Sequence, residues 1–188
     1  MQSWREIVRE TAPILFLTTL GGIVAGLFLE GIRVELEYIP GLLILLPAII
    51  GMRGNISGAL GSRLASALHL GLLKPEFGRN DVTVTNFTAS MILNVGMSVL
   101  LGVLAHFVAI VFSFKTAGIL ALTTISVVAG TLAGFMLTIL TFYFAVIVYR
   151  RGLDPDNVLA PALATVGDAL TIVCLLVAVK VVLYLGLA

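Results

Sequence analysis

The segment from Ile39 to Leu70, IPGLLILLPAIIGMRGNISGALGSRLASALHL, is apolar over most of its length and carries only two charged side chains, Arg53 and Arg63. It is longer than the run of about 18 apolar residues that indicates a transmembrane helix. Its glycines and Pro47 weaken a helix and expose backbone carbonyls, which membrane proteins tolerate only where the backbone is buried in protein or lines water. The segment therefore predicts a membrane-spanning helix with one face that does not contact lipid.

Four more apolar segments accompany residues 39–70, and they occupy residues 11–29, 84–114, 118–149 and 158–187. Of the 188 residues, 60% are hydrophobic and only 11% are charged, whereas a soluble domain carries about 25% charged residues. So few charges cannot cover a surface that faces water. We therefore expect an all-α, polytopic membrane protein in which residues 1–188 form a single transmembrane domain of five helices, surrounded by membrane lipid.

Composition and motifs argue against two other classes of protein. The net charge of +1 leaves no basic patch for neutralising the phosphates of a nucleic acid. An intramembrane serine hydrolase with His106 as its base would need a glycine-x-serine-glycine motif. The nearest stretch, Gly54-Asn55-Ile56-Ser57-Gly58, does not have that spacing. We therefore do not expect an enzyme.

The basic residues are distributed unevenly between the two ends of the predicted helices. One side of the membrane holds seven of them: Arg5, Arg9, Arg63, Lys74, Arg79, Arg150 and Arg151. The other side holds three: Arg33, Lys115 and Lys180. Because cytosolic loops carry the excess of lysine and arginine, we expect a multi-pass protein of the cell membrane with a cytosolic N-terminus and an extracytosolic C-terminus. The loop with Glu30, Glu35 and Glu37 then faces outward, where its acids either gather cations or are simply solvated.

Polar or small residues recur at helical spacing in every predicted helix. In residues 39–70 they are Pro47, Gly51, Gly54, Asn55, Gly58, Ser62 and Ser66. In residues 84–114 they are Asn86, Ser90, Asn94, Ser98, Gly102 and His106. This set is suited either to hydrogen bonding between helices or to lining a pore. The last helix and its start carry Asn157, Pro161, Thr165, Asp168 and Thr171. Two further patterns consist of small residues: Thr18-Gly22-Gly26 and Gly130-Gly134-Thr138. We attribute both to helix packing, because small residues let helices approach each other closely.

Asp168 is the principal candidate for a functional residue. It lies about ten residues into the last apolar segment, roughly 15 Å deep at the rise of an α-helix and close to the middle of the bilayer. A carboxylate at that depth costs several kcal/mol unless it faces water, a cation or a partner. The structural alternatives are a protonated Asp168 bonded to a neighbouring helix and an ion pair with Arg53. The functional interpretation places Asp168 on an ion path, and Arg53, which would repel a cation, then has a structural role.

Two stretches resemble a known family. Leu46-Pro47-Ala48-Ile49-Ile50-Gly51-Met52-Arg53-Gly54-Asn55, followed by Gly58-Ala59-Leu60-Gly61-Ser62-Arg63-Leu64, is similar to the second membrane helix of the MgtE magnesium channels and the related eukaryotic solute carriers. Leu153-Asp154-Pro155-Asp156-Asn157, followed by Pro161, Thr165 and Asp168, is similar to that family's fifth membrane helix. The resemblance covers the whole membrane part of the family.

The resemblance implies a homodimer whose pore is lined mainly by the second and fifth helices. This agrees with five helices per chain, because a symmetric dimer is a simple way to form a central pore. Asp168 matches an aspartate that faces its symmetry mate and holds hydrated Mg²⁺. The resemblance also gives candidate pore-lining residues: Pro47, Gly54, Asn55, Asn157, Pro161, Ala164 and Thr165. Asp154 and Asp156 are then candidates for the cytosolic mouth of the pore.

Typical members of the family carry a large cytosolic region with nucleotide-binding CBS modules, which sense magnesium and close the pore. Only about ten residues precede the first apolar segment here. A separate regulatory subunit therefore supplies the gate, or the gate is lacking, or the sequence is a fragment. We expect transport of a divalent cation, Mg²⁺ in the first place, and the alternative is a proton-coupled carrier of another divalent metal or a small solute.

Overall fold

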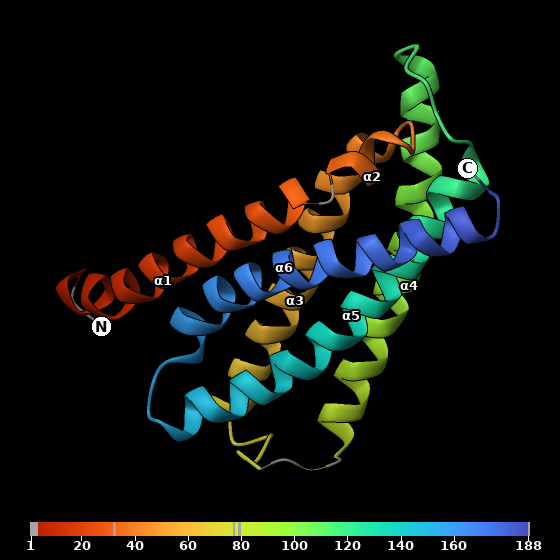
Figure 1. Ribbon diagram of the computed structural model, residues 1–188. Coiled ribbons are helices and arrows are strands. Elements are labelled where there is room, and N and C mark those ends of the chain that lie inside the picture. The colour runs from red at the N-terminus through yellow and green to blue at the C-terminus, as the bar shows by residue number, and fades with distance from the viewer. Residues whose placement is uncertain (1–3, 32, 77, 79, 188) are drawn as a thin grey trace.

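The computed structural model describes residues 4–31, 33–76, 78 and 80–187, without the side chains of residues 6, 7, 10, 35, 156 and 157. The described chain forms helices only: α1 (Trp4–Gly31), α2 (Arg33–Glu37), α3 (Leu42–His69), α4 (Asp81–Val111), α5 (Ile119–Arg150) and α6 (Pro155–Tyr184) (Figure 1). All of these except the short α2 are long and apolar enough to cross a membrane. The prediction of an all-α protein with five transmembrane helices is confirmed.

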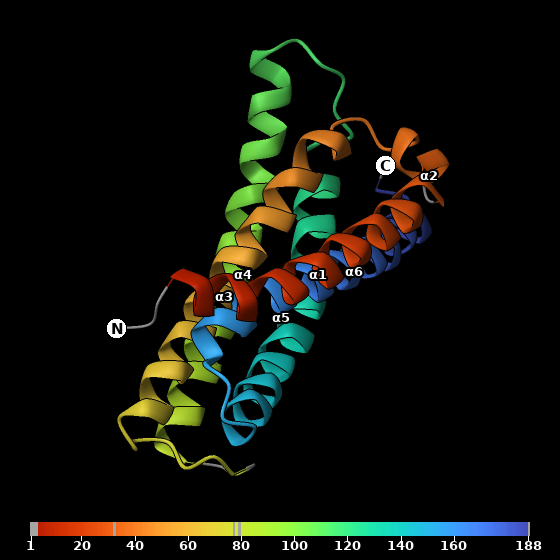
Figure 2. The ribbon, with the colours of Figure 1, turned by 90° about the vertical axis from the view of Figure 1, so that its left-hand side faces the viewer.

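Helices α3, α4 and α5 pack on one another, and α6 packs on α5 and α3. Helix α1 is peripheral, because its only long partner in the described chain is α6. The two lie side by side in both views (Figures 1 and 2). Two apolar clusters hold the bundle together. The one toward the start of α3 includes Leu45, Ile49, Leu122, Ile125 and Leu175. The one toward the end of α3 includes Leu60, Leu64, Val148, Leu159 and Leu163.

Some helix ends differ from the expected ones for local chemical reasons. Helix α4 begins at Asp81 rather than residue 84, because the Asn80 side chain accepts a hydrogen bond from the Thr83 N–H at 2.8 Å and caps the first turn. Helix α3 begins at Leu42, after Gly41, whose φ of 90° lies in the left-handed region that favours glycine.

The polar stripe of α4 is a packing face in this chain. Ser90, Asn94, Ser98 and Gly102 are buried. A Cβ on Gly130 of α5 would collide with the Ser98 side chain, and a Cβ on Gly134 would collide with Asn94. Small residues therefore let α4 and α5 approach closely, as expected for α5. This contact favours the interhelical role for the α4 stripe over the lining of a pore.

The prediction that Gly22 and Gly26 lie on the packing face of α1 is wrong for the contacts within a single chain. Gly22 and Gly26 are exposed, and a Cβ on either would meet no atom within 4 Å. Gly21 and Ala25 instead contact the bundle: a Cβ on Gly21 would collide with the Thr165 methyl group, and Ala25 is buried. The physical reason is that α1 has only one neighbouring long helix, so only one of its two small-residue faces is covered.

The two ends of the bundle carry different segments. The start of α1, the connection from α3 to α4 and the connection from α5 to α6 lie at one end, and α2 and the C-terminal end of α6 lie at the other (Figure 1). The first end therefore gathers the basic residues of the α1 start and the two connections. There the Arg150 guanidinium donates a hydrogen bond to the Pro75 carbonyl, which ties the two connections together.

Candidate functional site

Helix α3 exposes several of its polar and small residues on the side away from its own bundle. Most of its apolar positions are buried or partly buried, and the helix packs against α4, α5 and α6. The residues exposed on its other side include Pro47, Gly51, Gly54, Asn55, Ser62 and Ser66. A single helix facing lipid shows the reverse distribution, with apolar side chains outward, because backbone and amide groups in hydrocarbon lack hydrogen-bond partners. The exposed face of α3 is therefore suited to water or to another protein surface.

The first half of α6 lies beside this face. A Cβ on Gly61 of α3 would lie 3.7 Å from side-chain atoms of Leu159 and Leu163, so the two helices are in close contact there. Next to this contact is a cavity of about 250 Å³ between the two helices. It is lined by Gly58, Gly61, Ser62, Pro155, Leu159, Ala160 and Leu163. Two segments more than 90 residues apart in the sequence thus form one continuous surface.

The other α6 candidates differ in how open they are. Ala164 is exposed and Pro161 is half-buried. Thr165 is directed toward α1, because its hydroxyl lies 3.3 Å from the carbonyl oxygens of both Thr18 and Pro161. The side chains of Asp156 and Asn157 lie outside the described residues. Sequence reasoning missed Ala160, an exposed residue of the cavity, since alanine carries no chemical signal and only its spacing of four from Ala164 points to it.

Asp168 is half-buried in the middle of α6. Within the described chain it makes no hydrogen bond and no ion pair. Arg53 forms no ion pair with Asp168 among the described residues; its Nη2 group instead donates hydrogen bonds to the backbone carbonyls of Ala129 (2.9 Å) and Gly130 (2.7 Å) of α5. Neither structural alternative for Asp168 is therefore formed in one chain. The carboxylate is left available for a ligand or for a group from outside the chain.

Asp154 lies at the start of α6 and joins it to the end of α3. Its Oδ1 atom is 3.7 Å from Nε2 of His69, the last residue of α3. The His69 ring also lies edge-on to the Tyr149 ring, with 5.5 Å between centroids. These contacts bring the ends of α3, α5 and α6 together. Asp154 is thus placed at the same end of the bundle as the cavity between α3 and α6.

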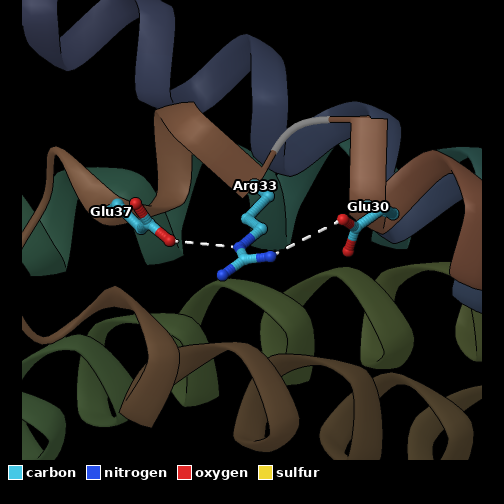
Figure 3. A network of polar contacts seen from close by, with 3 residues as sticks. All are labelled: Glu30, Arg33 and Glu37. Carbon is cyan, nitrogen blue, oxygen red and sulfur yellow. Dashed lines mark hydrogen bonds and ion pairs between the residues drawn. The ribbon is translucent and has the colours of Figure 1, made fainter.

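The acidic segment at the opposite end is partly neutralised. Arg33 of α2 lies between two carboxylates, with Nε 3.1 Å from Glu37 and Nη1 3.7 Å from Glu30 (Figure 3). All three side chains are more than 60% exposed, so the pairs contribute little to stability. They nevertheless cancel part of the negative charge of this loop. This arrangement favours the solvated loop over a strong cation-gathering mouth.

Within the described residues, no three His, Cys, Asp or Glu side chains are grouped closely enough to hold a metal ion. His106 is occupied locally, since its Nδ1 atom is 3.1 Å from the Thr116 hydroxyl. Its ring also packs edge-on against Phe107. The two histidines are thus engaged at opposite ends of the bundle, in keeping with the packing and interfacial roles expected for them.

Residues 46–178 match the family MgtE, described as "Divalent cation transporter". Solute carrier family 41 member 3 of Rattus norvegicus is 29% identical over an alignment of 169 positions that covers 85% of this chain and 35% of the relative. Solute carrier family 41 member 2 of Gallus gallus is 25% identical over an alignment of 187 positions that covers 91% of this chain and 32% of the relative. The chain spans about a third of the length of the curated relatives it matches.

The family match includes both stretches that suggested it in the sequence, residues 46–64 on α3 and residues 153–168 at the start of α6. It extends over well over half of the chain. The five apolar helices make the protein a multi-pass membrane protein, as transport across a bilayer requires. The chain belongs to the MgtE family of divalent cation transporters.

Proposed function

We propose that two copies of the chain form a homodimer that transports a divalent cation, Mg²⁺ in the first place, across the cell membrane. The ion path runs along the exposed face of α3 and the first half of α6, at or near the dimer axis. In the proposed dimer this face of each chain meets the same face of the other. The candidate pore-lining residues are Pro47, Gly54, Asn55, Asn157, Pro161, Ala164 and Thr165, with Ala160 added from the cavity.

The observation that carries this proposal is the outward-facing polar face of α3. Gly51, Gly54 and Asn55 are exposed in the middle of a helix that is apolar enough to cross a membrane. Each unsatisfied polar group in hydrocarbon costs several kcal/mol. A face of this kind is stable in a membrane when water or a second protein surface covers it. A pore between two copies supplies both.

The chemistry of Asp168 suits Mg²⁺ in particular. This ion holds its water tightly and is usually bound through one or two carboxylates while several waters remain. Two Asp168 carboxylates, one from each copy, would bind hydrated Mg²⁺ mainly through its waters. Selectivity would then depend on the size of the hydrated ion and on the spacing of the groups that line its path. One carboxylate per chain is sufficient for such a site.

The proposed orientation follows the basic residues. The end of the bundle with Lys74, Arg150 and Arg151 faces the cytosol, because basic loops are retained there. Asp154 and Asp156 then lie at the cytosolic mouth of the path. Acidic side chains at this mouth raise the local concentration of cations.

Cysteine accessibility along the path tests the proposal. Cys174, the single cysteine of the sequence, is buried and is replaced with Ala. Asn55→Cys is then introduced, and purified protein is reconstituted into liposomes for Mg²⁺ flux measurements. We expect a membrane-impermeant, water-soluble thiol reagent to reduce Mg²⁺ flux through Asn55→Cys by about tenfold or more, because the thiol lies in the water-filled path and the adduct obstructs it.

Ile92 provides the matched control. It lies in the middle of α4 and is 67% exposed, so Ile92→Cys places a thiol on an exposed apolar face that the proposal assigns to lipid. The reagent should leave flux through Ile92→Cys unchanged. Loss of flux in both variants, or in neither, would argue against an ion path along α3.

A further inference from the structure

A cavity of about 460 Å³ lies at the end of the bundle that carries α2. Its walls come from α2, the start of α3 and the connection between α4 and α5, which lie at the same end of the bundle (Figures 1 and 2). This volume falls within the roughly 300–1,000 Å³ typical of ligand pockets. The lining residues are apolar except for Glu37 and Lys115. The cavity thus combines an apolar wall with two opposite charges.

The packing of the bundle holds the walls of this cavity in place. Leu36 and Ile39 are buried and belong to the apolar cluster toward the start of α3. The Ala117 N–H donates a hydrogen bond to the Pro40 carbonyl at 2.8 Å, which joins the connection before α3 to the connection before α5. The cavity is therefore a built-in feature of the fold.

The position of the cavity along the helices corresponds to the surface of a membrane. Leu43 lies in the first turn of α3, inside the apolar span, whereas Glu37 and Lys115 lie outside the spans. Tyr38 is 72% exposed beside them, and tyrosine is enriched at the boundary between lipid and water. The apolar part of the cavity therefore lies at the level of acyl chains, and its two charges lie at the level of lipid headgroups.

Both charged residues of the cavity are available to a ligand. Lys115 is exposed and forms no ion pair within the part of the chain that the structure describes. Glu37 accepts a hydrogen bond from Arg33 at 3.1 Å (Figure 3), but a carboxylate can accept several such bonds. The cavity therefore offers one cationic group and one anionic group to the same ligand.

We propose that this cavity binds one phospholipid whose headgroup carries a primary ammonium, as in phosphatidylethanolamine. The ammonium donates hydrogen bonds to Glu37, the phosphate lies beside Lys115, and an acyl chain follows the apolar wall at Leu43. A choline nitrogen carries no hydrogen and cannot donate such a bond, and a glycerol headgroup brings no positive charge to Glu37. The inference does not depend on the proposed function.

Native mass spectrometry of the purified protein in detergent tests the lipid preference. Phosphatidylethanolamine, phosphatidylcholine and phosphatidylglycerol with identical acyl chains are added in turn. We expect phosphatidylethanolamine to bind about fivefold more tightly than either of the others, which is the effect of one favourable charge pair at an exposed site. Equal binding of the three lipids would show only the general lipid coat of the transmembrane helices and would overturn the inference.

Two pairs of variants assign the charges. Glu37→Gln should remove the preference for ethanolamine over choline. Glu30→Gln removes the other carboxylate beside Arg33 but lies outside the cavity lining, so it should keep that preference. Lys115→Gln should weaken the binding of all three phospholipids about fivefold, because each carries a phosphate. Lys180→Gln changes another exposed lysine that does not line the cavity and should have no effect.

A larger side chain at Leu43 tests the apolar part of the cavity. Leu43 is 63% exposed, so Leu43→Trp fills the cavity without entering the core, and it should lower binding of phosphatidylethanolamine about fivefold or more. Leu120→Trp is the control, because Leu120 is 69% exposed near the start of α5 and does not line the cavity.

Three results would overturn the inference at the level of the site. One is a folded Leu43→Trp protein that binds the lipid as the parent does. Another is a preference for ethanolamine that survives Glu37→Gln. The third is lipid binding by the monomer but not by the dimer, because a second copy of the chain would then cover the cavity.

Discussion

Replacing Asp168 with Asn is expected to lower selective Mg²⁺ flux about a hundredfold or more while the protein stays folded. The substitution keeps the size of the side chain and removes one negative charge from each copy of the proposed dimer. A hydrogen bond to a charged group contributes about 1.5–3 kcal/mol. Losing one such bond to the waters of the ion in each copy therefore costs at least about 3 kcal/mol, or roughly a hundredfold in binding. Radiotracer or dye-based flux in liposomes measures the effect.

Two controls make the result specific to the position of Asp168. Asp81→Asn is the same chemical change at an exposed residue in the first turn of α4, and it should leave flux unchanged. Asp168→Glu keeps the charge and should retain part of the flux. A folded, dimeric Asp168→Asn protein that still takes up Mg²⁺ selectively would contradict the assignment of this residue to the ion path.

The five long helices were predictable because length and apolar composition alone identify them. The features that were not predictable depend on shorter-range chemistry. Helix α2, with the sequence RVELE, is too short and too charged to stand out as an apolar segment. The start of α4 depends on the Asn80 side-chain oxygen, which accepts hydrogen bonds from the N–H and the hydroxyl of Thr83. Asn80 is a favoured capping residue, so this boundary was readable in principle.

The site was predictable to the level of helix faces but not of contacts. Spacing in the sequence identifies Gly54 and Asn55 as members of one face of α3, and the structure exposes both. Spacing cannot decide which of two small-residue faces of α1 meets α6, because that choice depends on the position of α6. The hydrogen-bond acceptors of Arg53 could not be predicted from the sequence either. They are backbone carbonyls of α5, and every residue has a backbone carbonyl.

The contact between the backbones of α4 and α5 at Gly102 predicts a large effect on stability. A Cβ on Gly102 would collide with the Cα of Thr123 and lie 2.9 Å from its backbone nitrogen and 3.0 Å from the Leu122 carbonyl oxygen. Backbone atoms cannot rotate away as a side chain can, so Gly102→Ala must separate the two helices. We expect this substitution to lower the free energy of unfolding by about 1–3 kcal/mol. Thermal unfolding in detergent, followed by far-UV circular dichroism, measures the change.

Gly96 separates this steric effect from the intrinsic preference of alanine for helices. It lies in the same helix, and a Cβ there would meet no atom within 4 Å. Both substitutions gain the same helix propensity, which favours alanine over glycine by about 1 kcal/mol in a helix interior. The difference between Gly102→Ala and Gly96→Ala therefore reports the contact with α5 alone. Equal unfolding midpoints for the two variants would mean that α4 and α5 do not pack as closely as described. The burial of Arg53 beside Ser98 and Gly130 would then lose its basis, because that burial depends on the same interface between α4 and α5.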